Sequence, residues 1–200
     1  MPSSPVKDAR VRRTQRRLRE TLVSLIHEKS YPAIAVSEIL ERADVGRSAF
    51  YAHFPNKDAL LASGIEYVLH ATPSRQTARA PARFRKVLWF SFAVFEYVGQ
   101  CRHGGDSRIE MPDRLIVHER LRQVLVELIQ DDVSEMMRCS TGRRNNLSPG
   151  AVTDYIASTF ILVLNWWADN GAALSSVDID DVFLSLVVPT LTSQIDGEGA

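Results

Sequence analysis

The chain has 200 residues, of which 45% are hydrophobic and 24% charged, and its 24 basic and 24 acidic residues give a formal net charge of zero. This length allows one or two domains, and the composition is ordinary for a soluble globular protein with a hydrophobic core. No stretch reaches the roughly 18 apolar residues that a membrane helix needs. Cys101 and Cys139 are isolated, as in a reducing compartment. We therefore expect a cytoplasmic protein without a membrane partner.

The neutral charge hides a basic head and an acidic tail. The first 60 residues hold eleven Lys or Arg against seven Asp or Glu, whereas residues 151–200 hold seven acidic residues and no Lys or Arg. Arg12 and Arg13 belong to a run between Lys7 and Arg19 of seven basic residues and one acidic residue. Double-stranded DNA, with one charge per ~1.7 Å, attracts such a run. By itself, the run also fits a solubilising and partly disordered N-terminus.

An apolar stripe between the basic positions predicts the first helix. Leu18, Leu22, Leu25 and Ile26 recur at helical spacing, so we expect a helix from about residue 8 to 27 that ends before Tyr31 and Pro32. This helix would support the elements that follow it.

The segment from Val36 to Leu61 predicts two short helices around a turn and the start of a third helix. Val36, Ile39, Leu40 and Ala43 give the first short helix one apolar face. Asp44, Val45 and Gly46 interrupt the period; we expect Gly46 to permit the tight turn and Val45 to fill the space between the helices.

A second short helix is expected to begin at Arg47. Phe50 and Phe54 would be buried, which leaves Arg47, Ser48, Tyr51 and His53 facing outward with side chains that suit phosphates and base edges. Helix-turn-helix proteins read DNA with such a second helix.

Pro55 is expected to end this helix, because the residue before a proline is disfavoured in helical geometry. Asn56 would then cap a helix running from Lys57 to about residue 71. Lys57 at that helix start would suit a DNA phosphate. Residues 72–81 contain helix breakers and are expected to connect two parts of the chain.

Four further helices are expected beyond this connection. The residues 83–100 are apolar on nearly every side, which predicts an enclosed central helix. A long helix should run from about Val117 to Cys139. Ser148 and Pro149 should start another that Gly171 ends, and a last helix after Asp178 should be kinked at Pro189.

The run AVSEILERADVGRSAFYAHFPNKDALL resembles the helix-turn-helix signature of the TetR/AcrR family of bacterial repressors. The likeness covers about residues 18–68 and includes a helix end, a proline and a helix cap. The family generally has Thr or Ser at the position of Ala35, and a small hydroxyl or Gly at Gly46 and Ser48. Losing a capping hydroxyl at Ala35 would cost the helix about 1 kcal/mol.

The resemblance implies an all-α protein of about nine helices. It would comprise a three-helix DNA-binding domain and a helical domain for ligand binding and dimerisation. We assign residues 1–55, with the basic arm, to the first and residues 56–200 to the second. The last two helices would pair with those of a second copy, although the residues alone also allow them to be used within one monomer. Such a homodimer would bind a near-palindromic double-stranded DNA operator.

The residues predicted to contact DNA lie in the second short helix, around it and in the arm. They are Arg47, Ser48, Ala49, Tyr51, His53, Lys57, Arg12 and Arg13.

Aromatic residues crowd the predicted second domain. Most would belong to a core or a dimer interface, but family members resembling this chain keep an apolar cavity there. An aromatic-lined pocket with a few polar groups is also the general form of a small-molecule site. The candidates are Phe92, Phe95, Met111, Asn165 and Trp166.

We therefore expect a sequence-specific transcriptional regulator, a repressor released from its operator by a small apolar or aromatic effector. The alternative is a helical ligand-binding or scaffold protein whose head does not read DNA. No GxSxG, HExxH, CxxC or phosphate-binding GxxxxGK[ST] pattern is present, so we expect neither an enzyme nor a metal or other cofactor.

Overall fold

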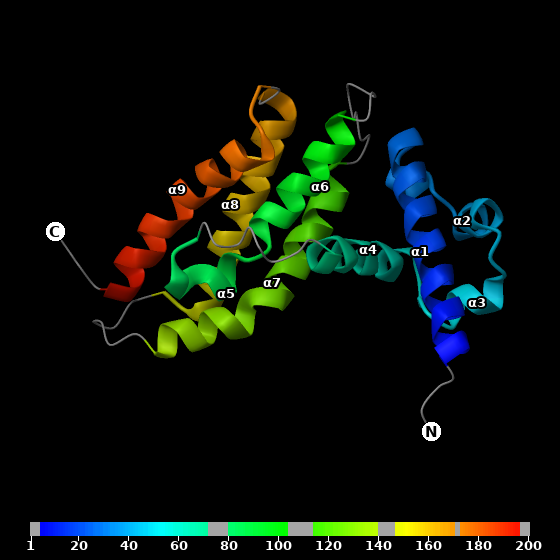
Figure 1. The fold of residues 1–200 in the computed structure, drawn as a ribbon, viewed down its shortest axis with the longest axis horizontal. Helices are drawn as coiled ribbons and strands as arrows, with labels where there is room; N and C mark the ends of the chain where they lie inside the picture. Colours follow the sequence, from blue (N-terminus) through cyan, green and yellow to red (C-terminus); the bar gives the residue numbers. More distant parts are fainter. Residues whose placement is uncertain (1–4, 72–79, 104–113, 140–146, 171–172, 197–200) are drawn as a thin grey trace. The chain divides into compact units, whose positions relative to one another are not determined.

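The computed structural model describes residues 5–71, 80–103, 114–139, 147–170 and 173–196, and nine α-helices lie within these ranges (Figure 1). The described residues form two compact units. Residues 5–67 and 114–121 belong to the first unit, and residues 68–71, 80–103 and 122–196, where described, to the second. The first unit is therefore discontinuous along the chain. The functional division at residues 55 and 56 stays a prediction.

The first unit is built from α1 (Pro5–Glu28), the 3-10 helix η1 (Tyr31–Ala33), α2 (Val36–Ala43), α3 (Arg47–Tyr51) and most of α4 (Lys57–Ala71). The apolar stripe predicted for the first helix is buried: Leu18 and Leu25 have no exposed surface. They share one core with Ile39, Phe50 and Leu60, and Val117 packs against this core. Helices as short as α2 and α3 depend on such packing, since short isolated helices are marginal in water.

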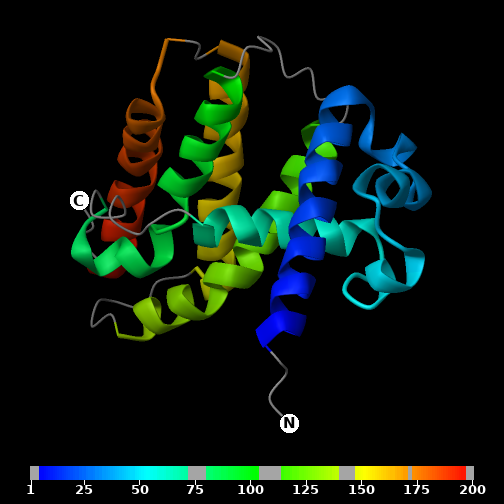
Figure 2. The same ribbon diagram turned by 45° about the vertical axis from the view of Figure 1, so that its right-hand side comes forward.

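The second unit contains η3 (Ala82–Phe84), α5 (Arg85–Leu88), α6 (Ser91–His103), most of α7 (Arg114–Arg138), α8 (Pro149–Asn170) and α9 (Ser176–Asp196). The helix α9 lies alongside both α6 and α8, as the two views show (Figure 1 and Figure 2). Their interior is a cluster of fully or almost fully buried aromatic rings, which are Phe90, Phe95, Phe160, Trp167 and Phe183.

The enclosed helix expected over residues 83–100 is two helices, so that prediction was wrong in its continuity. The helix is interrupted at Trp89 and Phe90, which lie between α5 and α6. Ser91 Oγ lies 2.6 Å from Asp180 Oδ1, on α9, and 3.2 Å from Leu88 O, and its single O–H donates to one of these two acceptors. Both side chains are buried. The break is thus tied to a tertiary contact, which the local sequence does not encode.

The ends of the last two helices follow their sequence signals. Ala151 N donates to Ser148 Oγ at 3.2 Å, which confirms the predicted cap of α8. At α9, Ser175 N donates to Asp178 Oδ2 at 3.0 Å, and Asp178 N donates back to Ser175 Oγ at 3.2 Å. This reciprocal pair is a capping box. The helix α9 continues through Pro189 without interruption.

None of the described helices combines the length and apolar character needed to cross a lipid bilayer.

Candidate nucleic-acid interface

A tight turn joins α2 to α3, and Asp44 is the residue that makes it. Asp44 has φ of 50° and ψ of 53°, in the left-handed region. Its N–H donates to Glu41 O at 3.1 Å, and Val45 N donates to Leu40 O at 3.0 Å, which satisfies carbonyls at the end of α2. Asp is among the few residues that tolerate this conformation.

Gly46 does not have the conformational role expected of it. Its φ of −68° and ψ of 149° are open to any residue, and an added Cβ would meet no atom within 4 Å. Only the location of the turn was predicted correctly; the residue with unusual geometry is Asp44, two positions earlier.

The helix α3 is anchored by one aromatic side chain and presents polar side chains to solvent. Phe50 is fully buried, and its ring stacks edge-to-face on Tyr51 with centroids 5.1 Å apart. Arg47 and Ser48 are exposed and Ala49 is half-buried. Within the described part of the chain, the Arg47 guanidinium makes no ion pair. These groups are available to a partner.

The helix α3 ends at Tyr51, before the predicted end at Pro55. His53 N and Phe54 N both donate to Phe50 O, at 2.9 and 2.8 Å. Two amides thus share one carbonyl in a turn that follows the helix. His53 therefore lies outside the helix, half-buried with its ring against Phe54. A proline disfavours helical geometry only at the residue before it. Pro55 therefore marked the last position at which α3 could end, and the helix ends earlier.

The basic residues of α1 form the second part of the candidate interface. Arg12 and Arg13 are exposed, and no ion pair of the described residues involves them. Arg17 reaches the turn itself, with its guanidinium Nη2 3.4 Å from Asp44 Oδ2. The basic helix and the helix-turn-helix are therefore in contact at Asp44.

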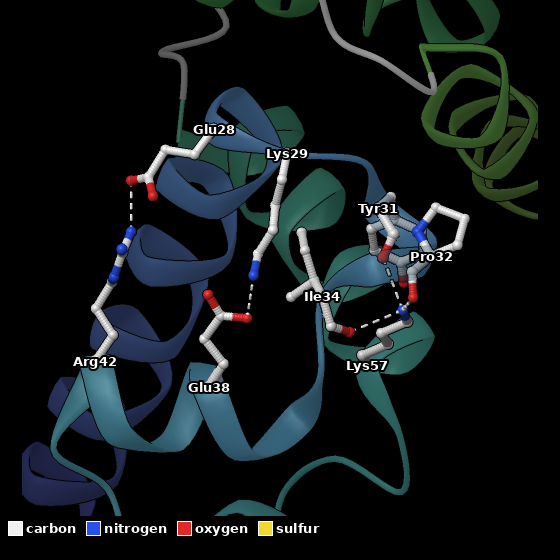
Figure 3. A network of polar contacts seen from close by, with 8 residues as sticks. All are labelled: Glu28, Lys29, Tyr31, Pro32, Ile34, Glu38, Arg42 and Lys57. Carbon is white, nitrogen blue, oxygen red and sulfur yellow. Dashed lines mark hydrogen bonds and ion pairs between the residues drawn. The ribbon is translucent and has the colours of Figure 1, made fainter.

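Two ion pairs hold the end of α1 against α2. Arg42 donates to the Glu28 carboxylate, and Lys29 Nζ lies 2.5 Å from Glu38 Oε2 (Figure 3). The hydrogen bond from Arg42 lowers the pKa of Glu28 below its ordinary value. Burial in contact with Asp58 raises the pKa of Tyr31, whose hydroxyl donates to Asp58 Oδ1 at 2.5 Å.

The start of α4 is capped as predicted, and Lys57 is engaged inside the unit. Ala59 N donates to Asn56 Oδ1 at 2.8 Å. Lys57 Nζ donates to the carbonyls of Tyr31, Pro32 and Ile34, a set of contacts that sequence analysis missed because backbone acceptors leave no sequence signal.

The predicted effector residues are in different environments. Phe92 and Phe95 are buried, and Phe95 packs on Phe160 and Trp167 with centroids 4.7 and 5.9 Å apart. On α8, Asn165 is half-buried and Trp166 is exposed, whereas the adjacent Trp167 joins the core. The structure thus brings Phe92 and Phe95 into the aromatic core and leaves Trp166 outside it. Met111 lies outside the described residues.

Comparison with known proteins supports the helix-turn-helix assignment. Residues 18–63 match the family model described as "Bacterial regulatory proteins, tetR family", which spans the end of α1 through the first half of α4. Over this helix-turn-helix region the chain resembles that family.

Two relatives share the same region. Over 56 residues the chain is 38% identical to the uncharacterized HTH-type transcriptional regulator YuxN of Bacillus subtilis (strain 168), which covers 28% of this chain and 19% of YuxN. Over 53 residues it is 36% identical to YerO of the same organism, also an uncharacterized HTH-type transcriptional regulator, covering 26% of this chain and 18% of YerO. The chain thus matches about a fifth of the length of these curated relatives.

The likeness in fold extends over almost the whole chain. The crystal structure of a TetR transcriptional regulator from Streptococcus agalactiae 2603V aligns with a TM-score of 0.52 over 91% of this chain and 97% of that one. The sequences are 22% identical. This match confirms the all-α architecture beyond the helix-turn-helix.

Proposed function

We propose that the protein is a dimeric transcriptional repressor that binds a near-palindromic operator and is released by a small apolar or aromatic effector. The observation that carries the proposal is the outward face of α3. Arg47, Ser48 and Tyr51 are exposed there, while Phe50 beneath them is fully buried. Their donors and acceptors suit base edges and phosphates. A repressor that binds DNA in this way would act in the cytoplasm.

Arg12 and Arg13 would add phosphate contacts, because an exposed basic run raises affinity for any duplex. His53 and Ala49 lie at the flanks of the exposed face and would meet the groove wall. The exposed guanidinium of Arg47 is the group best suited to a guanine edge.

Exposed apolar side chains on α8 and α9 support a dimer. Leu162 is 64% exposed and Trp166 45%, and their spacing of four residues places them on one face of α8. Leu186 on α9 is 45% exposed. Large apolar side chains grouped on one helix face commonly mark a protein interface. A two-fold dimer would present two copies of α3, so the operator would be palindromic.

The proposed effector site rests on the aromatic character of the second unit. Phe92 and Phe95 would lie beside the ligand, with Met111 and Asn165 as further candidates, whereas the exposed Trp166 fits the proposed dimer face better. The burial of Phe95 against Phe160 requires an effector to enter beside this ring or to displace it. Effector binding would change operator affinity only if the two conformations bind the effector differently.

Selection of bound duplexes from a random DNA pool, followed by titration of the recovered sequence, tests DNA reading. Arg47→Ala should weaken operator binding about tenfold or more, since a bidentate base contact contributes ~1–3 kcal/mol. Tyr51→Phe should weaken it less. Tyr67→Phe is the matched control, because Tyr51 and Tyr67 are both 51% exposed and only Tyr51 lies on α3.

Failure to recover any sequence would favour a ligand-binding or scaffold protein with a silent DNA-binding head. Light scattering of Trp166→Glu tests the dimer separately. We expect the mass of a monomer and, with it, weaker operator binding, whereas an unchanged dimer would contradict the proposed interface.

A further inference from the structure

Lys57 at the start of α4 makes three hydrogen bonds to backbone carbonyls of one short segment. Its Nζ lies 2.7 Å from Tyr31 O, 3.3 Å from Pro32 O and 3.0 Å from Ile34 O (Figure 3). A lysine ammonium has three N–H donors and no acceptor. The ammonium is therefore saturated within the unit, and a DNA phosphate could bind it only by displacing one of these carbonyls.

The ring of Tyr31 reinforces this contact from a second side. Lys57 Nζ lies 4.5 Å from the ring centroid, in cation–π geometry. The hydroxyl at the other end of the ring donates to Asp58, the residue after Lys57. Tyr31 itself is almost fully buried. Two consecutive residues of α4 thus hold one residue of η1 at both its ring and its carbonyl.

These contacts join the two ends of the helix-turn-helix. The segment Tyr31 to Ile34 directly precedes α2, and Lys57 directly follows the loop that leaves α3. Lys57 therefore closes a loop of chain that contains both short helices. Opening it would free the segments before α2 and after α3 together.

The start of α2 is held by the ion pair of Lys29 with Glu38, but it has no side-chain cap. Its N-cap residue is Ala35, which makes no side-chain capping bond. The carbonyl of Ile34, one residue earlier, is bound by Lys57 instead. Lys57 thus fixes the chain just before α2 from α4, although it does not bind the free N–H groups that a capping hydroxyl would accept from.

We propose that Lys57 is a positioning residue that sets the orientation of α2 and α3, and that it is not a phosphate contact. The proposal rests on the proposed DNA reading by α3 and adds how that helix is held. It replaces the role that the sequence suggested for Lys57.

The variant Lys57→Met separates positioning from phosphate binding, because methionine keeps an apolar stem and loses all three donors. Operator binding should weaken about tenfold or more through misplaced base contacts. Affinity for random duplex should stay the same, and so should the dependence of operator affinity on salt. If Lys57 contacted a phosphate, its loss would lower the affinity for random duplex. It would also reduce the slope of log affinity against log salt concentration by about 0.9.

Arg12→Ala is the matched control, since Arg12 is exposed and makes no ion pair within the described residues. It should lower affinity for operator and random duplex alike and reduce the salt slope. Circular dichroism confirms that each variant is folded. If Lys57→Met does not fold, Lys57→Gln, which retains two donors, takes its place.

Hydrogen exchange of the DNA-free protein tests the positioning without any operator. In Lys57→Met, amides of residues 31–51 should exchange faster, while those of residues 18–26 and of α8 should not change. Unchanged exchange in residues 31–51, or a reduced salt slope, would overturn the proposal. The wild-type protein could select no operator while exchange in residues 31–51 of Lys57→Met still rises as expected. In that case the proposed function fails, and the role of Lys57 in positioning α2 and α3 is supported.

Discussion

The helices of the two units are held in place by different kinds of contact. In the first, the helices that carry the candidate interface have only eight and five residues, and their ends are held by directional contacts such as those of Lys57 and Asp44. In the second, helices of 13 to 25 residues pack around aromatic rings. Short helices must be fixed at their joints, whereas long helices can be placed by the packing of their faces.

The largest expected effect lies in the aromatic core. Phe160 is fully buried against Phe90, Phe95 and Phe183, with centroids 4.7 to 5.3 Å apart. Phe160→Ala should lower the free energy of unfolding by about 3–5 kcal/mol. Urea unfolding followed by tryptophan fluorescence reports on this unit, because all three tryptophans belong to it. Ser158→Ala, exposed on the same helix, is the control; a similar small loss in both variants would contradict the comparison.

The turn between α2 and α3 gives the next effect. Asp44→Val should lower the free energy of unfolding by about 1–2 kcal/mol, because a β-branched residue is strained in the left-handed region. Gly46→Ala should instead raise it by about 0.4–1 kcal/mol, since its backbone geometry suits alanine and fewer unfolded conformations remain. Urea unfolding followed by circular dichroism measures both. If Asp44→Val and Gly46→Ala destabilised the protein equally, Gly46 would be as important to the turn as the sequence had predicted.

Ala35→Ser tests whether a side-chain cap on α2 adds stability to that given by the hydrogen bonds of Lys57. Ala35 has extended geometry and Glu38 stands three residues later, so a serine would complete a capping box. The free energy of unfolding should rise by about 0.5–1 kcal/mol, measured in the same way. Ala52→Ser, exposed after α3, should give no gain. No gain at Ala35 would mean that competition from Lys29 for Glu38 prevents the cap.

The smallest effect concerns the exposed pair of Glu28 and Arg42. The pKa of Glu28 is lowered in the folded state, so its contribution is complete above the ordinary value of 4.5 and is lost as the pH falls through the folded value. Glu28→Gln should therefore lower the melting temperature slightly at neutral pH and less in acid, and added salt should shrink the difference. Glu66→Gln, exposed on α4, is the control variant. A difference that persists in acid would argue against the ion pair.

Sequence patterns located the elements whose signals are local. The apolar spacing in α2, the start of α3 at Arg47 and the Asn56 cap of α4 were all confirmed. Asp44 was missed because glycine is the usual residue in tight turns, although aspartate also tolerates the left-handed region.

Contacts between distant residues were beyond sequence reasoning. The break between α5 and α6 lies in an unbroken apolar run, and its partner Asp180 is 89 residues from Ser91. The candidate effector residue Phe95 is buried in the core, which its aromatic character could not distinguish from a pocket wall. The carbonyls bound by Lys57 are present in every peptide, so only the fold identifies them.

The discontinuity of the first unit limits how it can be transferred between proteins. Val117 packs on the first core, yet it comes from the start of α7 rather than from the segment that carries the helix-turn-helix. A gene fragment ending after α4 would leave that core without this side chain. A chimera that joins residues 1–71 to a different second part would therefore need an apolar side chain at the position of Val117, and chimeras without one should have a lower free energy of unfolding.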